Sequence, residues 1–548
     1  MTHVRFRSIL VFAALLLTIP AVALSATGWK IVGWNDLGMH CTDGVDYSVF
    51  GILPPYNNVK AQVIDPNGKL ITTPTGLTVT YEAVADPDGS INKSSIGKTN
   101  FWSWLPALFG ASLAPDAGLA GRSMPGAANT PQPMAWDATR GWFVAEGVPI
   151  TPYDDGGSKN FYPMMKLVVR DSTGTVLATS SVVLPVSDEM DCRNCHASGS
   201  VGGPRPAAGW VNDPDPLRDY KLNILRLHDE KSKVKASALF ASALAAKGYR
   251  ADGLYASATA GAKPVLCAQC HSSNALPGLG FAGVAPLTAA IHGLHANATD
   301  PTSGQTLDAS TNRTSCYRCH PGSVTRCLRG AMSAAVAADG STAIQCQSCH
   351  GSMSEVGRAD RNGWLQEPLC QSCHTGTATV NRGSLRYFSV YTAPGVVRTA
   401  ADQTFASNPD TPAAGTSLYR FSTGHGKLQC EACHGSTHAE YPSTHRNDNI
   451  QNVALQGHVG MLSECTACHA TDPSTTNGGP HGMHPVGQVW VSRHPDAADS
   501  NRTQCQACHG TDYRGTVLSR TLAARTISAF GTKNFFRGSI IGCYTCHN

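Results

Sequence analysis

One pentapeptide, Cys-x-x-Cys-His, recurs nine times in this 548-residue chain, always with two residues between its cysteines. The composition of the chain predicts only about 0.03 copies by chance. This spacing is typical of the covalent attachment of c-type haem. The nine copies begin at Cys192, Cys267, Cys316, Cys346, Cys370, Cys430, Cys465, Cys505 and Cys543.

The chemistry of attachment explains the pattern. Two thiols at this spacing form thioethers with one porphyrin, and the adjacent histidine supplies the proximal imidazole to iron. We therefore predict nine covalently bound haem c groups. A disulfide or a zinc ribbon is the alternative for a cysteine pair, but zinc sites do not require a histidine directly after every second cysteine. The second cysteines and proximal histidines are Cys195, His196, Cys270, His271, Cys319, His320, Cys349, His350, Cys373, His374, Cys433, His434, Cys468, His469, Cys508, His509, Cys546 and His547.

The sixth ligand of each iron distinguishes an electron carrier from an enzyme, because an open site binds small molecules whereas a second histidine closes it. Ten further histidines in the motif-bearing region face nine haems, which favours two imidazoles on every iron and one spare histidine. Two pairs three residues apart share a helical face, so each pair could serve two adjacent haems. The candidates are His228, His292, His295, His425, His438, His445, His458, His481, His484 and His494.

The region from Cys192 onward is rich in Gly, Ala, Ser, Thr and Asn. Such a segment buries too little apolar area to offset its conformational entropy, so we expect porphyrins to supply its core. Its clearest helix is predicted from Asn223 to Lys247 and ends at Gly248. We assign residues 189–548 to a loop-rich, haem-cored domain with few short helices.

Residues 27–188 lack the motif and predict a β-sandwich domain. Alternation of apolar and polar residues predicts strands at 77–83 and 166–170. Turns with Asp first and Gly fourth are predicted at 65–68, 86–89 and 171–174. An irregular insertion from Lys98 to Gly147 is rich in Trp and Phe, which either pack onto their own domain or form a docking surface. We expect residues 189–548 alone to keep all nine haems.

Residues 1–25 predict a secretory signal peptide, with Arg5 and Arg7 before an apolar stretch that ends in small residues. A retained membrane anchor is the alternative. We expect an exported protein, in the periplasm, on the outer cell surface or outside the cell, with no membrane span after signal removal. The formal charge of +4 falls to about −7 once the signal is lost and the haem propionates are counted. No basic stripe indicates nucleic acid.

Two cysteines, Cys41 and Cys327, lie outside the motifs and could pair as a disulfide in an oxidising compartment. The tripeptide Met39-His40-Cys41 carries soft metal ligands that would suit copper. Consecutive residues of a strand point to opposite faces, however, so we favour a structural role for these three.

The nine motifs make residues 190–548 resemble the multihaem c-type cytochromes that serve extracellular electron transfer in metal-reducing bacteria. The order of Trp34–Cys41 in a β domain, followed by Asp191–His196, is similar to one branch of these proteins. The resemblance implies a wire of closely spaced haems that exchanges electrons with other redox proteins or an extracellular acceptor. Two alternatives stay open. One is a multihaem reductase of a small oxyanion, and the other is a self-assembling cytochrome filament subunit.

Overall fold

The computed structural model describes residues 28–190, 192–200, 204–322, 324–337, 339–361, 373, 387–398, 423, 425–470, 484–516, 519–521 and 524–547. The expected signal peptide lies outside these ranges. The fold is mixed, with several antiparallel sheets and a set of mostly short helices. In the part of the chain described, no helix combines the length and apolar character needed to cross a membrane.

Two four-stranded antiparallel sheets occupy the N-terminal region, and one buried cluster takes side chains from both, among them Val59, Tyr81 and Leu167. The first sheet runs in the order β1 (Lys30–Asn35), β4 (Asn57–Ile64), β8 (Trp142–Val148) and β7 (Ala135–Asp137). The second runs in the order β10 (Val176–Val183), β9 (Met164–Arg170), β5 (Thr78–Val84) and β6 (Gln132–Pro133).

Both predicted strands are confirmed, as β5 and β9. The three predicted turns are confirmed as well, since Gly68, Gly89 and Gly174 donate to the carbonyls of Asp65, Asp86 and Asp171 at 2.8–3.0 Å. All three glycines have a φ between 75° and 90°, a conformation that L side chains rarely adopt.

The predicted insertion is less irregular than the sequence indicated, because its second half forms β6, β7 and β8. Its first half contains α1 (Phe101–Phe109), whose Phe101, Leu105 and Leu108 are buried against Tyr47 and Leu266. The aromatic side chains therefore pack inward, partly against the motif-bearing region, rather than forming an exposed docking surface.

The predicted helix at 223–247 is two helices, α3 (Pro216–Lys235) and α4 (Ser237–Ala246). The first of them, α3, starts earlier than predicted because the side chain of Asp215 accepts the N–H of Leu217 and caps the first turn. Leu222 and Leu244 are buried in the same cluster. In a straight helix they would stand about 33 Å apart, so the break at Ala236 is what lets both reach that cluster.

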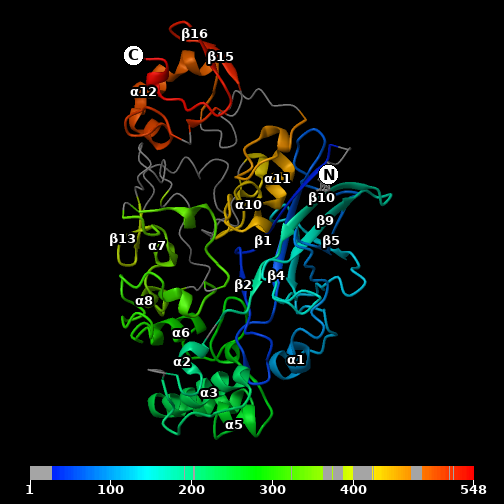
Figure 1. Ribbon diagram of the computed structural model, residues 1–548, viewed down its shortest axis with the longest axis vertical. Helices are drawn as coiled ribbons and strands as arrows, with labels where there is room; N and C mark the ends of the chain where they lie inside the picture. The colour runs from blue at the N-terminus through cyan, green and yellow to red at the C-terminus, as the bar shows by residue number, and fades with distance from the viewer. Residues whose placement is uncertain are drawn as a thin grey trace, which may run out of the picture.

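The helices of residues 189–548 follow one another along the long axis of the molecule, beside the two sheets, from α3 and α5 (Leu254–Thr259) at one end to α12 (Gln488–His509) at the other (Figure 1). Most of the described residues in this region form loops and turns, which connect short helices. Among these helices are α2 (Arg193–His196), α6 (Leu287–His295), α7 (Cys346–His350), α8 (Met353–Val356), α10 (Cys430–His434) and α11 (Ile450–Gln456). Two hairpins also occur here, β13 (Tyr391–Ala393) with β14 (Val396–Val397), and β15 (Arg525–Ser528) with β16 (Thr532–Phe535).

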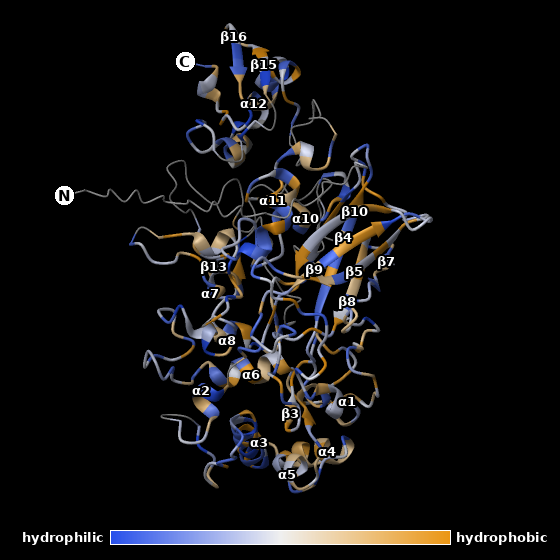
Figure 2. Ribbon diagram, turned by 45° about the vertical axis from the view of Figure 1, so that its right-hand side comes forward, coloured by the Kyte–Doolittle hydropathy of each residue, from blue (hydrophilic) through white to orange (hydrophobic). Residues whose placement is uncertain are grey.

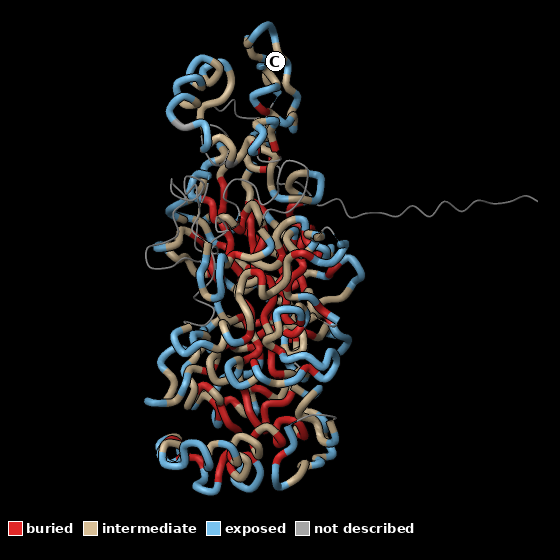
Figure 3. The backbone as a smooth tube through the Cα atoms, turned by 90° about the vertical axis from the view of Figure 1, so that its left-hand side faces the viewer, coloured by how far each residue is buried: buried red, intermediate tan, exposed pale blue. Residues whose placement is uncertain are grey.

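Side chains and strands of the N-terminal region enter the motif-bearing region. The strand β3 (Phe50–Gly51) pairs with β12 (Val265–Leu266), whereas β2 (His40–Cys41) pairs with β11 (Val186–Ser187). Hydrophobic strands concentrate in the two sheets, and α3 is largely hydrophilic (Figure 2). Buried segments run through the middle of the molecule (Figure 3). Among the described residues, those from 484 onward join none of the buried apolar clusters.

Candidate haem sites

Each motif that is described in full forms one helical turn. The N–H of the histidine donates to the carbonyl of the first cysteine, as in His196 to Cys192 at 2.9 Å and His271 to Cys267 at 3.0 Å. Positions three apart share a helical face, so the two thiols lie on the same side and the histidine follows one residue later. Eight motifs are described in this way. Of the motif that begins at Cys370, only Cys373 falls within the described residues.

Seven proximal histidines each face one histidine from the predicted set of distal ligands. The distances between ring centroids fall between 5.8 and 6.3 Å, whereas the angles between ring planes range from 9° to 87°. The pairs, proximal residue first, are His196 with His295, His271 with His228, His320 with His292, His350 with His438, His469 with His425, His509 with His484, and His547 with His494.

This constant distance fits a metal ion between the two rings. A metal–imidazole bond is about 2.0 Å long and the ring centroid lies roughly 1.1 Å behind the nitrogen, so two imidazoles on one ion place their centroids about 6.2 Å apart. Rotation about the ligand axis leaves that distance unchanged, which accounts for the wide range of angles. Rings that stack directly have centroids much closer together, such as those of His445 and Tyr162 at 3.6 Å.

Backbone carbonyls hold the rings in place. Nδ1 of seven paired histidines lies 2.6–2.9 Å from a carbonyl oxygen, which leaves Nε2 to face the partner ring. Metal-ligating histidines are oriented in this way in general. The carbonyls belong to Ala285 for His271, Thr288 for His292, Ile291 for His295, Leu37 for His438, Pro485 for His484, Val491 for His494, and Ile541 for His509.

Burial keeps several of these imidazoles neutral. It lowers the pKa of His196, His228 and His320 to about 4 and that of His350 to about 3, because desolvation disfavours the charged ring. A neutral imidazole is the form that binds a metal ion, so these rings need lose no proton to do so at neutral pH.

A single cavity of about 1850 Å³ joins the first four motifs. Pockets for one small molecule span about 300–1000 Å³, so this space suits several large groups in a row. The cysteines and histidines of these motifs line it, together with His228, His292, His295 and His438. Cys373, Cys430 and His434 extend the lining toward the fifth and sixth motifs.

Neighbouring sites share elements. The helix α6 supplies both His292 and His295, and these two histidines face those of the third and the first motif, His320 and His196. Cys316 and Cys346 line the same cavity, which brings the third and fourth motifs to one space. Similarly, Cys433 and Cys468 pack against one cluster, which places the sixth beside the seventh.

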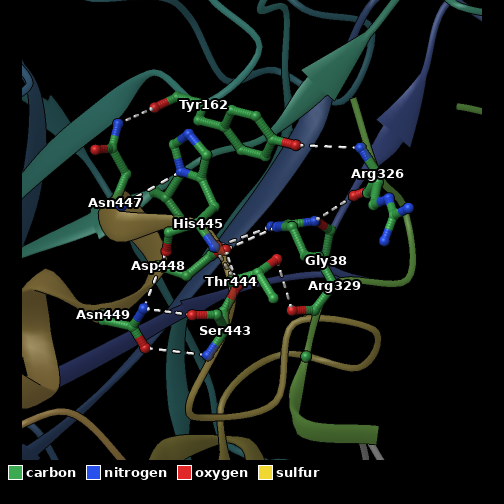
Figure 4. Close-up of polar contacts among 12 residues, drawn as sticks. Gly38, Tyr162, Arg326, Arg329, Ser443, Thr444, His445, Asn447, Asp448 and Asn449 are labelled. Carbon is green, nitrogen blue, oxygen red and sulfur yellow. Dashed lines mark hydrogen bonds and ion pairs between the residues drawn. The ribbon is translucent and has the colours of Figure 1, made fainter. Parts of the chain in front are cut away.

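The remaining predicted ligands lie outside these seven pairs. His445 stacks on Tyr162, and its Nδ1 accepts the N–H of Asn447 at 3.3 Å (Figure 4). His458 is 51% exposed and lies 3.3 Å from a carboxylate oxygen of Glu464. His481 and the proximal His374 lie outside the described residues, and the proximal His434 is in none of the seven pairs.

The tripeptide Met39-His40-Cys41 lies at the strand β2 (His40–Cys41). His40 is buried with its ring edge-on to Tyr56 at 4.7 Å, and among the described residues no three His, Cys, Asp or Glu side chains are arranged so that they alone could hold a metal ion. Cys41 and Cys327 are both free thiols, and the sulfur of Cys327 lies 3.8 Å from Nδ1 of His438.

Sequence reasoning supplied the histidines but missed the groups that orient them. Four of the seven carbonyls belong to residues within four positions of their own histidine. This closeness in the sequence is the only signal that could have indicated them. The carbonyl of Leu37 comes from the N-terminal region, 401 residues away from His438. Comparisons with models of protein families, with curated proteins and with solved structures found no match.

Proposed function

We propose that this chain is an exported electron-transfer protein with nine covalently attached haems, each held by one Cys-x-x-Cys-His motif. The seven facing histidine pairs, with centroids 5.8–6.3 Å apart, carry this proposal. We infer further that the two N-terminal sheets form the β-sandwich expected from the sequence and that haems provide the core of residues 189–548.

The described residues fit covalently bound haem in three respects. Each described motif places two thiols on one side of a helical turn, which is what attachment to one porphyrin requires. The paired imidazoles leave the space that one metal ion needs. The large shared cavity then accommodates several porphyrins side by side.

When bound, each haem supplies a reversible one-electron couple at its iron. The chain's residues determine how that couple is used. The two histidines of each pair would hold the iron together and so leave no site for a small substrate, while the carbonyls behind Nδ1 fix the rings. Shared elements such as α6 would hold neighbouring haems close together, which is what electron transfer along a series of sites requires. Donors and acceptors would be other redox proteins or an extracellular acceptor.

A spectroelectrochemical titration with a carbon monoxide arm tests this function. We expect nine one-electron equivalents per chain and a Soret band of the dithionite-reduced protein that carbon monoxide leaves unchanged. Fewer than eight equivalents would contradict the nine-site wire. A Soret shift with carbon monoxide equal to one haem in nine would instead favour a reductase of a small oxyanion. Filaments in electron micrographs of the holoprotein would favour a self-assembling filament subunit.

A further inference from the structure

The segment from Asn35 to Cys41 makes an unusual turn between β1 and β2. Leu37 has a φ of 58° and Gly38 a φ of 71°, so two consecutive residues adopt the left-handed conformation. Such a conformation is strained for leucine and persists only where the surroundings fix it. The turn directs the carbonyls of both residues toward segments of the motif-bearing region.

The two carbonyls contact the fourth candidate haem site and its support. Nδ1 of His438 lies 2.9 Å from the oxygen of Leu37. The guanidinium of Arg329 donates to the oxygen of Gly38 at 2.6 Å (Figure 4). The backbone N–H groups of Arg329 and Gly330 donate to the carbonyl of His438 itself, at 2.7 and 2.8 Å. One turn and one loop thus hold both the ring and the backbone of this histidine.

Close packing leaves this arrangement no room to shift. A Cβ at Gly38 would lie 2.2 Å from the carbonyl oxygen of Thr437, the residue before His438. On the other side, a Cβ at Gly330 would lie 2.1 Å from a carboxylate oxygen of Glu440, whose other oxygen accepts the N–H of His438 at 2.7 Å. Glycine is therefore required at both positions.

We propose that the Leu37–Gly38 turn and Arg329 are positioning residues for His438, so that the N-terminal region sets the tautomer and orientation of the sixth ligand at the fourth site. This inference rests on the proposed haem at His350. The Leu37 carbonyl fixes the proton of His438 on Nδ1 and leaves Nε2 for the iron, while Arg329 holds the turn in place. Outer contacts of this kind change metal affinity about 10–100-fold.

Three glycine variants test the proposal in the exported holoprotein. Gly38→Ala and Gly330→Ala each push against the segment that carries His438. Gly44→Ala is the matched control, since Gly44 also has a positive φ, of 90°, but a Cβ there meets nothing within 4 Å. The readouts are the number of haems by intact mass, the low-spin fraction by magnetic circular dichroism, and the carbon monoxide bound per reduced chain.

We expect both test variants to keep nine covalent haems, because the thioethers are untouched, but to lose one low-spin haem in nine and to bind one carbon monoxide. Gly44→Ala should match the wild type. His438→Ala should also bind one carbon monoxide, and the double variant with Gly38→Ala should still bind one, because both changes act on the same iron.

Each failure has a different meaning. Wild-type behaviour of both Gly38→Ala and Gly330→Ala would overturn the positioning role while leaving the haem wire intact. Two carbon monoxide molecules in the double variant would overturn it as well, since the changes would then act on different haems. A wild type with seven or fewer haems, or a His438→Ala variant that binds no carbon monoxide, would contradict the proposed function itself. General misfolding of Gly38→Ala would appear as the loss of several low-spin haems. In that case Gly330→Ala alone tests whether His438 is held in position.

Discussion

The ion pair between Arg329 and Asp448 is buried where three parts of the chain meet, and its removal should destabilise the whole protein. The two side chains are 1% and 2% exposed and make two hydrogen bonds of 2.7 Å. The same guanidinium binds the Gly38 carbonyl and lies over the ring of Tyr162 at 5.0 Å. Asp448 also accepts the hydroxyl of Ser443 at 2.6 Å.

Asp448→Asn keeps the shape of the side chain but leaves the guanidinium as a buried charge without a counter-charge. Breaking a buried pair in this way costs about 3–5 kcal/mol of the free energy of unfolding. Asp88→Asn is a suitable control, because Asp88 pairs with Arg446 at a similar distance of 2.9 Å but the two side chains are 61% and 57% exposed. An exposed pair contributes at most about 1 kcal/mol.

Urea unfolding of both holoprotein variants, followed by far-ultraviolet circular dichroism, measures the difference. We expect Asp448→Asn to lose about 3 kcal/mol more than Asp88→Asn. Equal losses in the two variants would show that the buried pair does not hold the regions together, and would refute the role assigned to Arg329.

Three further predictions follow from particular side chains. His228→Ala should open the second site, so that the reduced protein binds one carbon monoxide. His445→Ala removes a ring stacked on Tyr162 and should bind none. Carbon monoxide binding by His445→Ala but not by His228→Ala would show that the pairing of His228 with His271 is wrong. Alkylation of the unfolded holoprotein without reductant should modify two thiols, Cys41 and Cys327. In the folded protein Cys41 should react slowly, because burial raises its pKa. If neither cysteine is alkylated in the unfolded protein, the two form a disulfide. Burial raises the pKa of Asp43 to about 6, above its unfolded value, so its contribution to stability is present below pH 4 and lost as the pH rises through 6. Urea midpoints should therefore show Asp43→Asn gaining stability relative to the wild type between pH 4 and pH 7, and a constant difference would contradict the shift.

Local patterns predicted local structure well. Asp and Gly at fixed positions gave the three turns, and the alternation in residues 77–83 gave β5, because these features depend on neighbours in the chain. The pair His292 and His295 on one helix is a similar case. The break at Ala236 could not be predicted, since it depends on which cluster Leu244 reaches.

The relation between the two regions was the least predictable feature. The sequence alone predicts that residues 189–548 keep every haem on their own. Gln451, however, hydrogen-bonds both backbone groups of Gly33, and the ring of His438 is oriented by the Leu37 carbonyl. Contacts between residues some 400 positions apart leave no periodic trace in a sequence. We now expect deletion of the N-terminal region to disturb the fourth site first.

Intact mass spectrometry of the exported protein tests the central claim most directly. The nine motifs predict a mass that exceeds the processed polypeptide by nine covalent haems, with every motif occupied. A fully matured sample with seven or fewer haems would contradict the continuous series of sites, and a mass equal to that of the polypeptide alone would contradict haem attachment altogether.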